Sequence, residues 1–272
     1  GLQVYKLMVV TDSSKIKDEM LHYDAWMLNG FKVPHFRTSK ETLIEGLQKH
    51  HIDAIAVELQ SEEESKKVLE FLFQSYPLIP VFKITEDTAY QAVIFERLRK
   101  SLDKINGDYT DDNFTYDQKF DAVRNRWLSK YLRGKLTDYK EFEEKNQIFR
   151  ANLCLQSPCI LAELSMPSRD EYLVSEWRYG ADRLEVALRN FFNPDLFLPN
   201  ISIAVTDSGV CRVLLSNKCF IKGAELTEIQ DFPGFLEKTI NEIRDYLSLD
   251  VKINNIQNFA NHIECFQFLN SH

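Results

Sequence analysis

The sequence predicts two α/β domains joined by a helical linker, and three observations lead to this prediction. Residues 5–105 alternate between short apolar runs and stretches with helical periodicity, the pattern of a parallel sheet with crossover helices. No apolar run that could supply a fifth strand follows residue 85 in this part of the chain. Residues 151–272 place helices before and after a two-strand hairpin, which is the order of an α+β domain.

The best-defined strand of the first domain is the run at residues 52–59. Its isoleucine and valine residues favour a buried, pleated surface, and the run is too short for a core helix. Asn29-Gly30 supplies the left-handed cap expected at the end of a helix. The predicted strands are 5–10, 31–36, 52–59 and 81–84, and the predicted helices are 15–28, 38–50, 62–76 and 88–105.

The linker begins in the polar, Asp-rich stretch 106–115 and contains two amphipathic helices, one at 116–132 and one capped by Thr137 that extends to about 149. In the second domain, Thr206-Asp-Ser-Gly209 is a turn between two strands. Its predicted strands are 159–166, 201–205, 210–215 and 251–254, and its predicted helices are 169–192, 232–249 and 259–269. We therefore place the domains at 1–105, 106–150 and 151–272.

Composition excludes several classes of function. A formal net charge of -8 argues against a nucleic-acid-binding surface on this chain, since such domains are usually basic. The 5 cysteines form no CxxC pair, so we expect no metal site. Their odd number and the lack of a signal peptide favour reduced thiols in the cytoplasm. No apolar run approaches about 20 residues, so no membrane span is expected.

The third predicted strand of the first domain contains the run Asp53-Ala-Ile-Ala-Val-Glu-Leu59. With this run the domain resembles a response-regulator receiver, a flavodoxin-like fold, but it lacks that fold's fifth strand. In the family the corresponding strand ends in the phosphoacceptor Asp, and here Glu58 stands in that place. The resemblance puts Thr11 and Asp12 where the family has its acidic magnesium pocket. It puts Thr85 where the family has its switch Ser or Thr. The family's fifth strand and its Lys have no counterpart here.

The middle and C-terminal parts resemble the inter-domain region of YesN-type, AraC-family response regulators. The resemblance rests on two segments, 126–136 (Arg-Trp-Leu-Ser-Lys-Tyr-Leu-Arg-Gly-Lys-Leu) and 177–191, which ends in Ala-Leu-Arg-Asn-Phe. In that family a basic DNA-binding domain follows, and this chain stops about where it would begin. The second domain itself has a ferredoxin-like order of strand, helix, hairpin, helix, strand.

The resemblance implies the regulatory part of a bacterial transcriptional response regulator, with a pseudo-receiver that is not phosphorylated and a domain that transmits or dimerises. It implies a homodimer, a sensor kinase or another protein as partner, and DNA contact only through a domain absent from this chain. Glu58 either imitates a phosphorylated Asp or is a solvated carboxylate without a signalling role. For Asp12 we favour the role of a helix N-cap over that of a relic metal ligand, and Thr85 is equally well interpreted as a plain cap of the next helix.

Two other functions stay open. The first is a stand-alone adaptor that binds a partner protein without contacting DNA. The second is a nucleotide-binding enzyme of cyclase-like fold, which needs carboxylates after the first strand of the second domain and a Gly-rich acidic hairpin. That strand instead leaves as Leu164-Ser-Met-Pro-Ser168, and the hairpin turn carries one Asp. Because the chain also lacks a phosphate loop and the GxSxG and HExxH motifs, we expect no catalytic residue and no cofactor.

Overall fold

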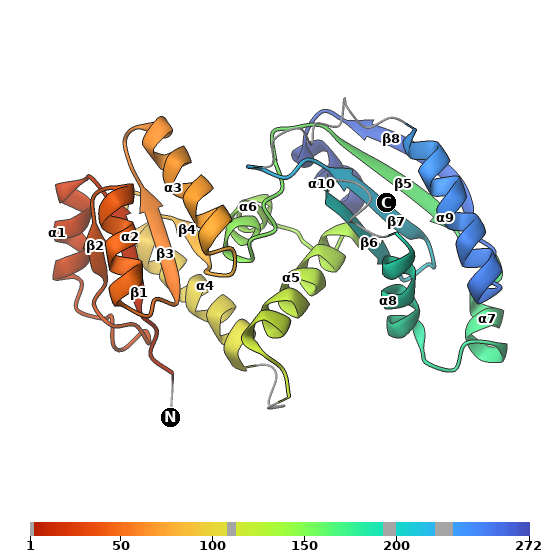
Figure 1. Ribbon diagram of the computed structural model, residues 1–272, viewed down its shortest axis with the longest axis horizontal. Helices are drawn as coiled ribbons and strands as arrows, with labels where there is room; N and C mark the ends of the chain where they lie inside the picture. Colours follow the sequence, from red (N-terminus) through yellow and green to blue (C-terminus); the bar gives the residue numbers. More distant parts are fainter. Residues whose placement is uncertain (1–2, 108–112, 193–199, 221–230) are drawn as a thin grey trace. The chain divides into compact units, whose positions relative to one another are not determined.

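The computed structural model describes residues 3–107, 113–192, 200–220 and 231–272 (Figure 1). The chain divides into two compact units: unit 1 is Gly1–Arg124 with Glu143–Ala151, and unit 2 is Asn125–Phe142 with Asn152–His272. The two helices expected in the linker are thus shared between the units, and linker residues 108–112 lie outside the described residues. None of the described helices has the length and apolar character needed to cross a bilayer.

Unit 1 contains a parallel sheet whose described strands have the order β2-β1-β3-β4. Every residue of β1 is buried, and β3 is buried as far as Val57, as expected for strands covered on both faces. The expected parallel α/β sheet is therefore confirmed. The four strands are β1 (Leu7–Thr11), β2 (His35–Arg37), β3 (Ala54–Glu58) and β4 (Val81–Lys83).

Helices cover both faces of this sheet. Leu43 of α2 and Val68 of α3 belong to one core cluster with Ile55 of β3. On the other face, Phe95 of α4 packs against Phe82 of β4 with ring centroids 5.6 Å apart. The helices before the second sheet are α1 (Ser14–His22), α2 (Lys40–Lys49), α3 (Glu62–Ser75), α4 (Thr88–Gly107), α5 (Tyr116–Leu132) and α6 (Tyr139–Ile148).

The first helix is shorter than the sequence predicted, because α1 ends at His22 and not at Leu28. Tyr23 leaves the helix in an extended conformation. The indole N–H of the buried Trp26 then donates to the Met20 carbonyl at 2.8 Å, which satisfies an acceptor at the helix end. The helix therefore ends at His22, with the Trp26 indole bonded to its last turn.

The second strand is also shorter than predicted. Phe31 makes only an isolated bridge with Tyr5, and the ladder with β1 begins at His35. Pro34 has no backbone N–H to donate, so it cannot extend the ladder toward Phe31. The remaining helices and strands of unit 1 differ from the predicted bounds by one or two residues at most ends.

Unit 2 contains an antiparallel sheet with the order β6-β7-β5-β8 in the described residues. Leu184 and Leu188 of α8 and Leu236 of α9 form a core cluster with one face of this sheet. On the other face α10 contacts β5, and Tyr131 of α5 hydrogen-bonds His262 of α10. The elements are β5 (Cys159–Ser165), α7 (Arg169–Ser175), α8 (Ala181–Phe191), β6 (Asn200–Val205), β7 (Cys211–Ser216), α9 (Phe232–Leu247), β8 (Lys252–Phe259) and α10 (His262–Ser271).

The long helix predicted over 169–192 is wrong, since the structure contains two helices, α7 and α8, in its place (Figure 1). Gly180 separates them with φ +87°, a conformation that helices do not contain. The Trp177 indole N–H donates to the Gly180 carbonyl at 2.8 Å and stabilises the break. Strand β8 is longer than the predicted 251–254 because it pairs with β5 along its length, a contact that no local pattern announces.

Candidate functional site

The structure brings two of the predicted receiver residues together at the carboxyl edge of the parallel sheet. Thr11 and Glu58 are register partners at the ends of β1 and β3. The buried Thr11 hydroxyl donates to Glu58 Oε2 at 3.2 Å and accepts from the Ser13 backbone N–H at 3.0 Å. Glu58 is half-buried. Its carboxylate is therefore held by a neighbouring side chain of the same sheet edge.

Asp12 and Thr85 make local contacts with backbone groups. Asp12 Oδ1 accepts from the Gln60 N–H at 3.2 Å, in the loop after Glu58. The side-chain cap of α1 comes from Ser13, so the cap interpretation of Asp12 is wrong. Thr85 Oγ1 accepts from the Asp87 N–H at 3.3 Å, next to the start of α4. The hydrogen bonds described do not connect Thr85 to Glu58.

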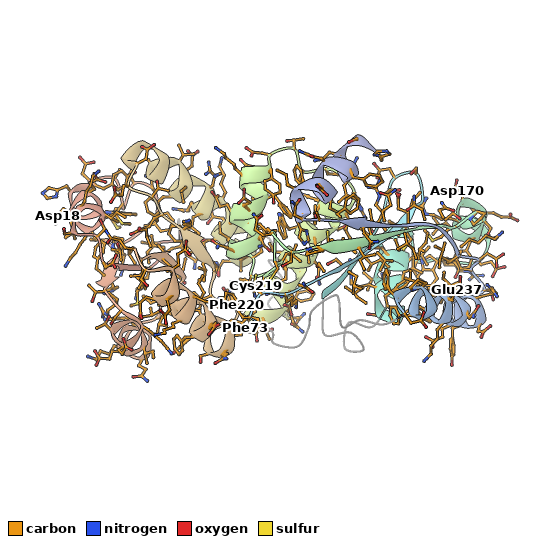
Figure 2. The ribbon with its side chains drawn as sticks, turned by 90° about the horizontal axis from the view of Figure 1, so that it is seen from above. Asp18, Phe73, Asp170, Cys219, Phe220 and Glu237 are labelled. Atoms are coloured by element: carbon orange, nitrogen blue, oxygen red, sulfur yellow. The ribbon has the colours of Figure 1, made fainter. Side chains whose placement is uncertain are left out.

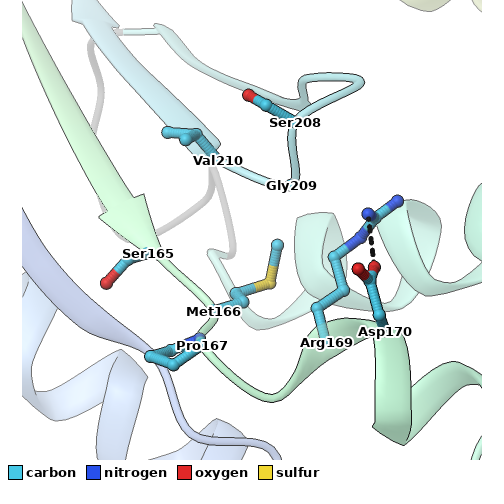
Figure 3. A pocket seen from close by; sticks show the side chains of 8 residues that line it. All are labelled: Ser165, Met166, Pro167, Arg169, Asp170, Ser208, Gly209 and Val210. Atoms are coloured by element: carbon cyan, nitrogen blue, oxygen red, sulfur yellow. Dashed lines mark hydrogen bonds and ion pairs between the residues drawn. The ribbon is translucent and has the colours of Figure 1, made fainter.

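A pocket lies in unit 2, between the end of β5 and the turn that joins β6 to β7 (Figure 3). Its volume is about 270 Å³. Ligand pockets commonly combine an apolar wall with a few polar groups that fix the ligand's orientation, and the residues lining this one fit that description. The lining residues are Ser165, Met166, Pro167, Arg169, Asp170, Ser208, Gly209 and Val210.

Arg169 is the principal charged group of this pocket. Its side chain is 17% exposed, and Nη1 lies 3.4 Å from the carboxylate of Asp170, which is 95% exposed. Gly209 has φ +88°, and a Cβ there would lie 3.2 Å from Arg169 Cδ. A side chain at this position would thus be strained by the backbone and tight against Arg169. The turn backbone and the guanidinium stem therefore pack closely.

The turn opposite Arg169 lies in a basic environment. The exposed Asp207 carboxylate accepts a hydrogen bond from Lys135 Nζ at 2.8 Å. This hydrogen bond and the Lys135 charge lower the pKa of Asp207, with smaller contributions from Arg133 and Arg169. Three cationic side chains therefore act at this turn of a chain with a net charge of -8.

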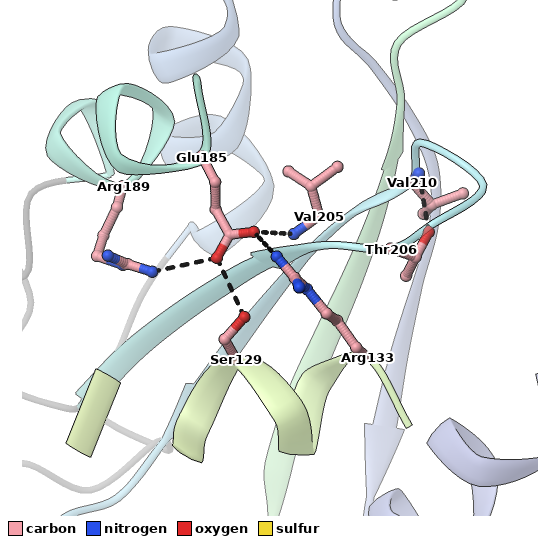
Figure 4. A network of polar contacts seen from close by, with 7 residues as sticks. All are labelled: Ser129, Arg133, Glu185, Arg189, Val205, Thr206 and Val210. Carbon is pink, nitrogen blue, oxygen red and sulfur yellow. Dashed lines mark hydrogen bonds and ion pairs between the residues drawn. The ribbon is translucent and has the colours of Figure 1, made fainter. Parts of the chain in front are cut away.

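The β6 side of the turn is held by a buried carboxylate, Glu185 of α8 (Figure 4). Glu185 accepts from the Ser129 hydroxyl at 3.1 Å, from the Val205 N–H at 3.2 Å and from Arg189 at 3.3 Å. Arg133 forms a further ion pair with it. Four donors, from α5 and the turn after it, from α8 and from β6, thus satisfy one buried charge, which is the condition for burying it.

Sequence reasoning considered the 164–168 exit of β5 and the 206–209 turn only as arguments against a cyclase site, and it predicted no pocket between them. It missed Arg169, and the only signal for it was a cation directly after Pro167-Ser168. It also missed Glu185, an acidic residue directly beside Leu184 and within one turn of Leu188 in an apolar pattern. The described part of the chain contains no group of three or more His, Cys, Asp or Glu residues that could hold a metal ion.

Comparison with known proteins gives little similarity. The chain matches no protein family model, and no curated protein matches it. Among solved structures it is similar to the GGDEF domain of FimX from Pseudomonas aeruginosa, at 12% sequence identity and a TM-score of 0.28. That similarity covers 45% of this chain and 80% of the FimX domain.

This finding contradicts the leading expectation of a transcriptional response regulator with a pseudo-receiver and a transmitter domain. The solved structure reported above is a GGDEF domain and not a response regulator. The similarity is too low to carry an assignment of fold or activity. A function for this chain must therefore rest on its own geometry.

Proposed function

We propose that this chain is a binding protein whose unit 2 takes the phosphate group of a small molecule, such as a nucleotide, in the pocket of Figure 3. The observation that carries the proposal is Arg169, a largely buried cation in the pocket wall with one long contact to Asp170 in the described structure. A guanidinium offers five N–H donors in a planar fork that matches phosphate oxygens. Its remaining donors can therefore serve a ligand.

The other groups near the pocket support an anionic ligand. Ser165 and Ser208 add hydroxyl groups to its lining, and Lys135 and Arg133 make the neighbouring turn more basic. A cavity of about 270 Å³ suits one end of a nucleotide, with the remainder in solvent.

The acidic groups favour binding over a metal-assisted reaction. Asp170, which lines the pocket, and Asp207, in the neighbouring turn, form ion pairs with Arg169 and Lys135, respectively. Metal-assisted phosphoryl transfer uses carboxylates that hold the ion next to the phosphate. In this proposal the pocket recognises the ligand and leaves it chemically unchanged.

We infer a finer description of the fold on the same basis. The parallel order β2-β1-β3-β4 is that of the first four strands of a flavodoxin-like, receiver-type sheet. The order strand, helix, hairpin, helix, strand in unit 2, with the hairpin β6–β7 beside β5, supports a ferredoxin-like domain.

Calorimetric titration of the full chain with GTP, ATP and pyrophosphate tests the proposed function. We expect saturable binding of at least one of these at physiological salt, weakened about tenfold by Arg169→Gln, because one charge-assisted contact contributes at least about 1.5 kcal/mol. Arg178→Gln, at an exposed position outside the pocket, is the matched control and should bind like the wild type. Equal affinities for wild type and Arg169→Gln would overturn the proposal.

An adaptor that binds a partner protein is the second candidate. Met27 and Leu28, in the turn after α1, have exposed fractions of 63% and 87%, and the nearby Leu21 and Val33 are also exposed. Exposed apolar residues gathered in one segment are typical of protein-binding surfaces. A second copy of the chain is the first partner to test. If light scattering shows a dimer, Met27→Ser with Leu28→Ser should give a monomer, whereas Val186→Ser should not.

A further inference from the structure

Two cysteines of unit 2, Cys154 and Cys219, lie on two backbone segments that hydrogen-bond each other outside the named strands. The Cys154 N–H donates to the Asn217 carbonyl at 3.1 Å, and the Cys219 N–H donates to the Asn152 carbonyl at 2.8 Å. Leu153 and Lys218 form an antiparallel bridge between these two contacts. The backbone therefore holds the two cysteines in a fixed register, close to the ends of β5 and β7.

The two sulfur atoms meet across this pairing. Cys154 Sγ and Cys219 Sγ are 2.8 Å apart, and both residues are half-buried thiols. A disulfide bond has a length of about 2.0 Å, so the two sulfur atoms lie within about 1 Å of bonding distance. Cys219, labelled in Figure 2, lies three residues beyond the end of β7.

The other three cysteines of the chain form a different class. Cys159, Cys211 and Cys265 are almost completely buried, at 0%, 1% and 0% exposed. Cys159 and Cys265 are hydrogen-bonded to each other, so they form a second pair of thiols. This second pair is enclosed in the core. An oxidant in solution reaches half-buried thiols sooner than enclosed ones. Accessibility and geometry thus select the same pair.

We propose that Cys154 and Cys219 form a reversible disulfide when the chain meets a peroxide, which makes this pair an oxidation site. The Cys154 sulfur attacks one peroxide oxygen and the O–O bond breaks, giving a sulfenic acid and one water molecule. The Cys219 sulfur then attacks the Cys154 sulfur, the S–O bond breaks, and the departing oxygen takes the Cys219 proton and leaves as water. Two thiols lose two electrons and two protons, and the peroxide is reduced to two water molecules.

The order of the two thiols follows from their contact. The hydrogen bond with Cys154, together with burial, holds the pKa of Cys219 well above its ordinary value. A raised pKa lowers the thiolate fraction of Cys219, so the proposal assigns the first attack on peroxide to Cys154 and the resolving step to Cys219.

The bond would strap two neighbouring strands of the sheet. Cys154 precedes β5 by a few residues and Cys219 follows β7, and the ladder between these strands starts at the pair Cys159 and Ser216. Closing this loop reduces the conformational entropy of the unfolded chain and stabilises the folded one. We expect the melting temperature of the oxidised protein to rise by about 5 °C or more, since loop closure of this length is a large effect for a chain of this size.

Peptide mapping after treatment of the full chain with hydrogen peroxide tests the proposal. The expected result is loss of two of the five thiols, a cross-linked peptide pair containing Cys154 and Cys219, and full recovery of the thiols with a dithiol reductant. Cys154→Ser and Cys219→Ser should each abolish the intramolecular cross-link. Cys211→Ala, which removes an unrelated buried thiol, should leave it unchanged.

Three results would overturn the proposal. One is a cross-link between Cys159 and Cys265 in place of the expected pair. Another is oxidation of Cys154 to a sulfinic acid with no bond to Cys219. The third is an unchanged melting temperature after the bond has formed, which would show that it does not strap β5 to β7.

Discussion

Each of the two sheets of this protein carries charged groups at one edge. The two edges differ in whether these groups already have hydrogen-bond partners within the chain. At the parallel sheet, Glu58 and Asp12 accept hydrogen bonds from Thr11 and from the Gln60 backbone. At the antiparallel sheet, Arg169 lines a pocket and makes a 3.4 Å contact with the exposed Asp170 in the described structure. The carboxylates of the first edge have hydrogen-bond donors within the chain, whereas Arg169 at the second edge has N–H donors left for a ligand.

The difference shows that an acidic residue at a strand end is weak evidence of a site. A carboxylate that finds donors in the chain is stabilised without a ligand, whereas a largely buried cation with spare donors is stabilised further by an anion. Glu185 has several hydrogen-bond donors within the chain and is not among the residues that line the pocket. It binds the Val205 N–H and so supports the strand next to the pocket.

The largest expected effect is the loss of Glu185. Glu185→Ala should lower the free energy of unfolding by about 3–5 kcal/mol, because it leaves Arg133 and Arg189 without their partner and the Val205 N–H unsatisfied. Chemical denaturation measures this loss. Glu237→Ala, at an exposed position of α9, should change stability by less than about 0.5 kcal/mol. Equal effects of the two substitutions would contradict the structural role of Glu185.

The next effect is a dependence of stability on pH that originates in His262. Burial lowers the pKa of His262 from 6.5 to about 4. Below pH 6.5 the unfolded chain therefore binds a proton that the folded chain refuses, so stability falls as pH drops from 6.5 to 4 and is unaffected above 6.5. The size of the loss is about 3 kcal/mol.

Denaturation curves across this pH range, compared with those of His262→Gln, isolate the contribution of His262. The variant should lose less stability between pH 6.5 and 4 than the wild type does. His22→Gln, at an exposed position of α1, should keep the full loss. Parallel curves for wild type and His262→Gln would show that the histidine is not buried as a neutral group.

The smallest effect concerns the edge that satisfies itself. Thr11→Val should cost about 1 kcal/mol of stability, because Glu58 loses its donor and the Ser13 N–H loses its acceptor while the strand keeps a β-branched residue. The substitution should leave nucleotide affinity unchanged. Thr38→Val, at an exposed position, is the control for stability. If Thr11→Val lost nucleotide binding, the ligand would bind at the edge of the parallel sheet, which would contradict the proposed pocket in unit 2.

Much of the fold could be predicted from local patterns. Helix α5 matches the predicted range 116–132 at both ends, because its apolar spacing and its terminating Gly134 are both local signals. The predicted helix 169–192 was wrong because apolar spacing continues across Gly180, whose backbone conformation the spacing does not report. The length of β8 could not be predicted either, since its pairing with β5 is a long-range contact.

The candidate site was predictable only in part. The resemblance placed Thr11, Asp12 and Glu58 in one pocket, but the register that joins Thr11 and not Asp12 to Glu58 is a long-range contact that the strand pattern does not give. Arg169 and Glu185 have no sequence signature, because their importance comes from burial and from partners distant in the chain, such as the 206–209 turn and Ser129. Residues whose charge is paired with a partner far away in the sequence can be recognised only once the fold is known.

The most direct test of the central claim is an amide chemical-shift titration of the isotopically labelled full chain with GTP or pyrophosphate. The account predicts shifts gathered at the pocket of Figure 3, from Ser165 to Asp170 and from Ser208 to Val210, that saturate and disappear in Arg169→Gln. Shifts gathered at Thr11, Asp12 and Glu58, or no saturable shift with either ligand, would contradict it.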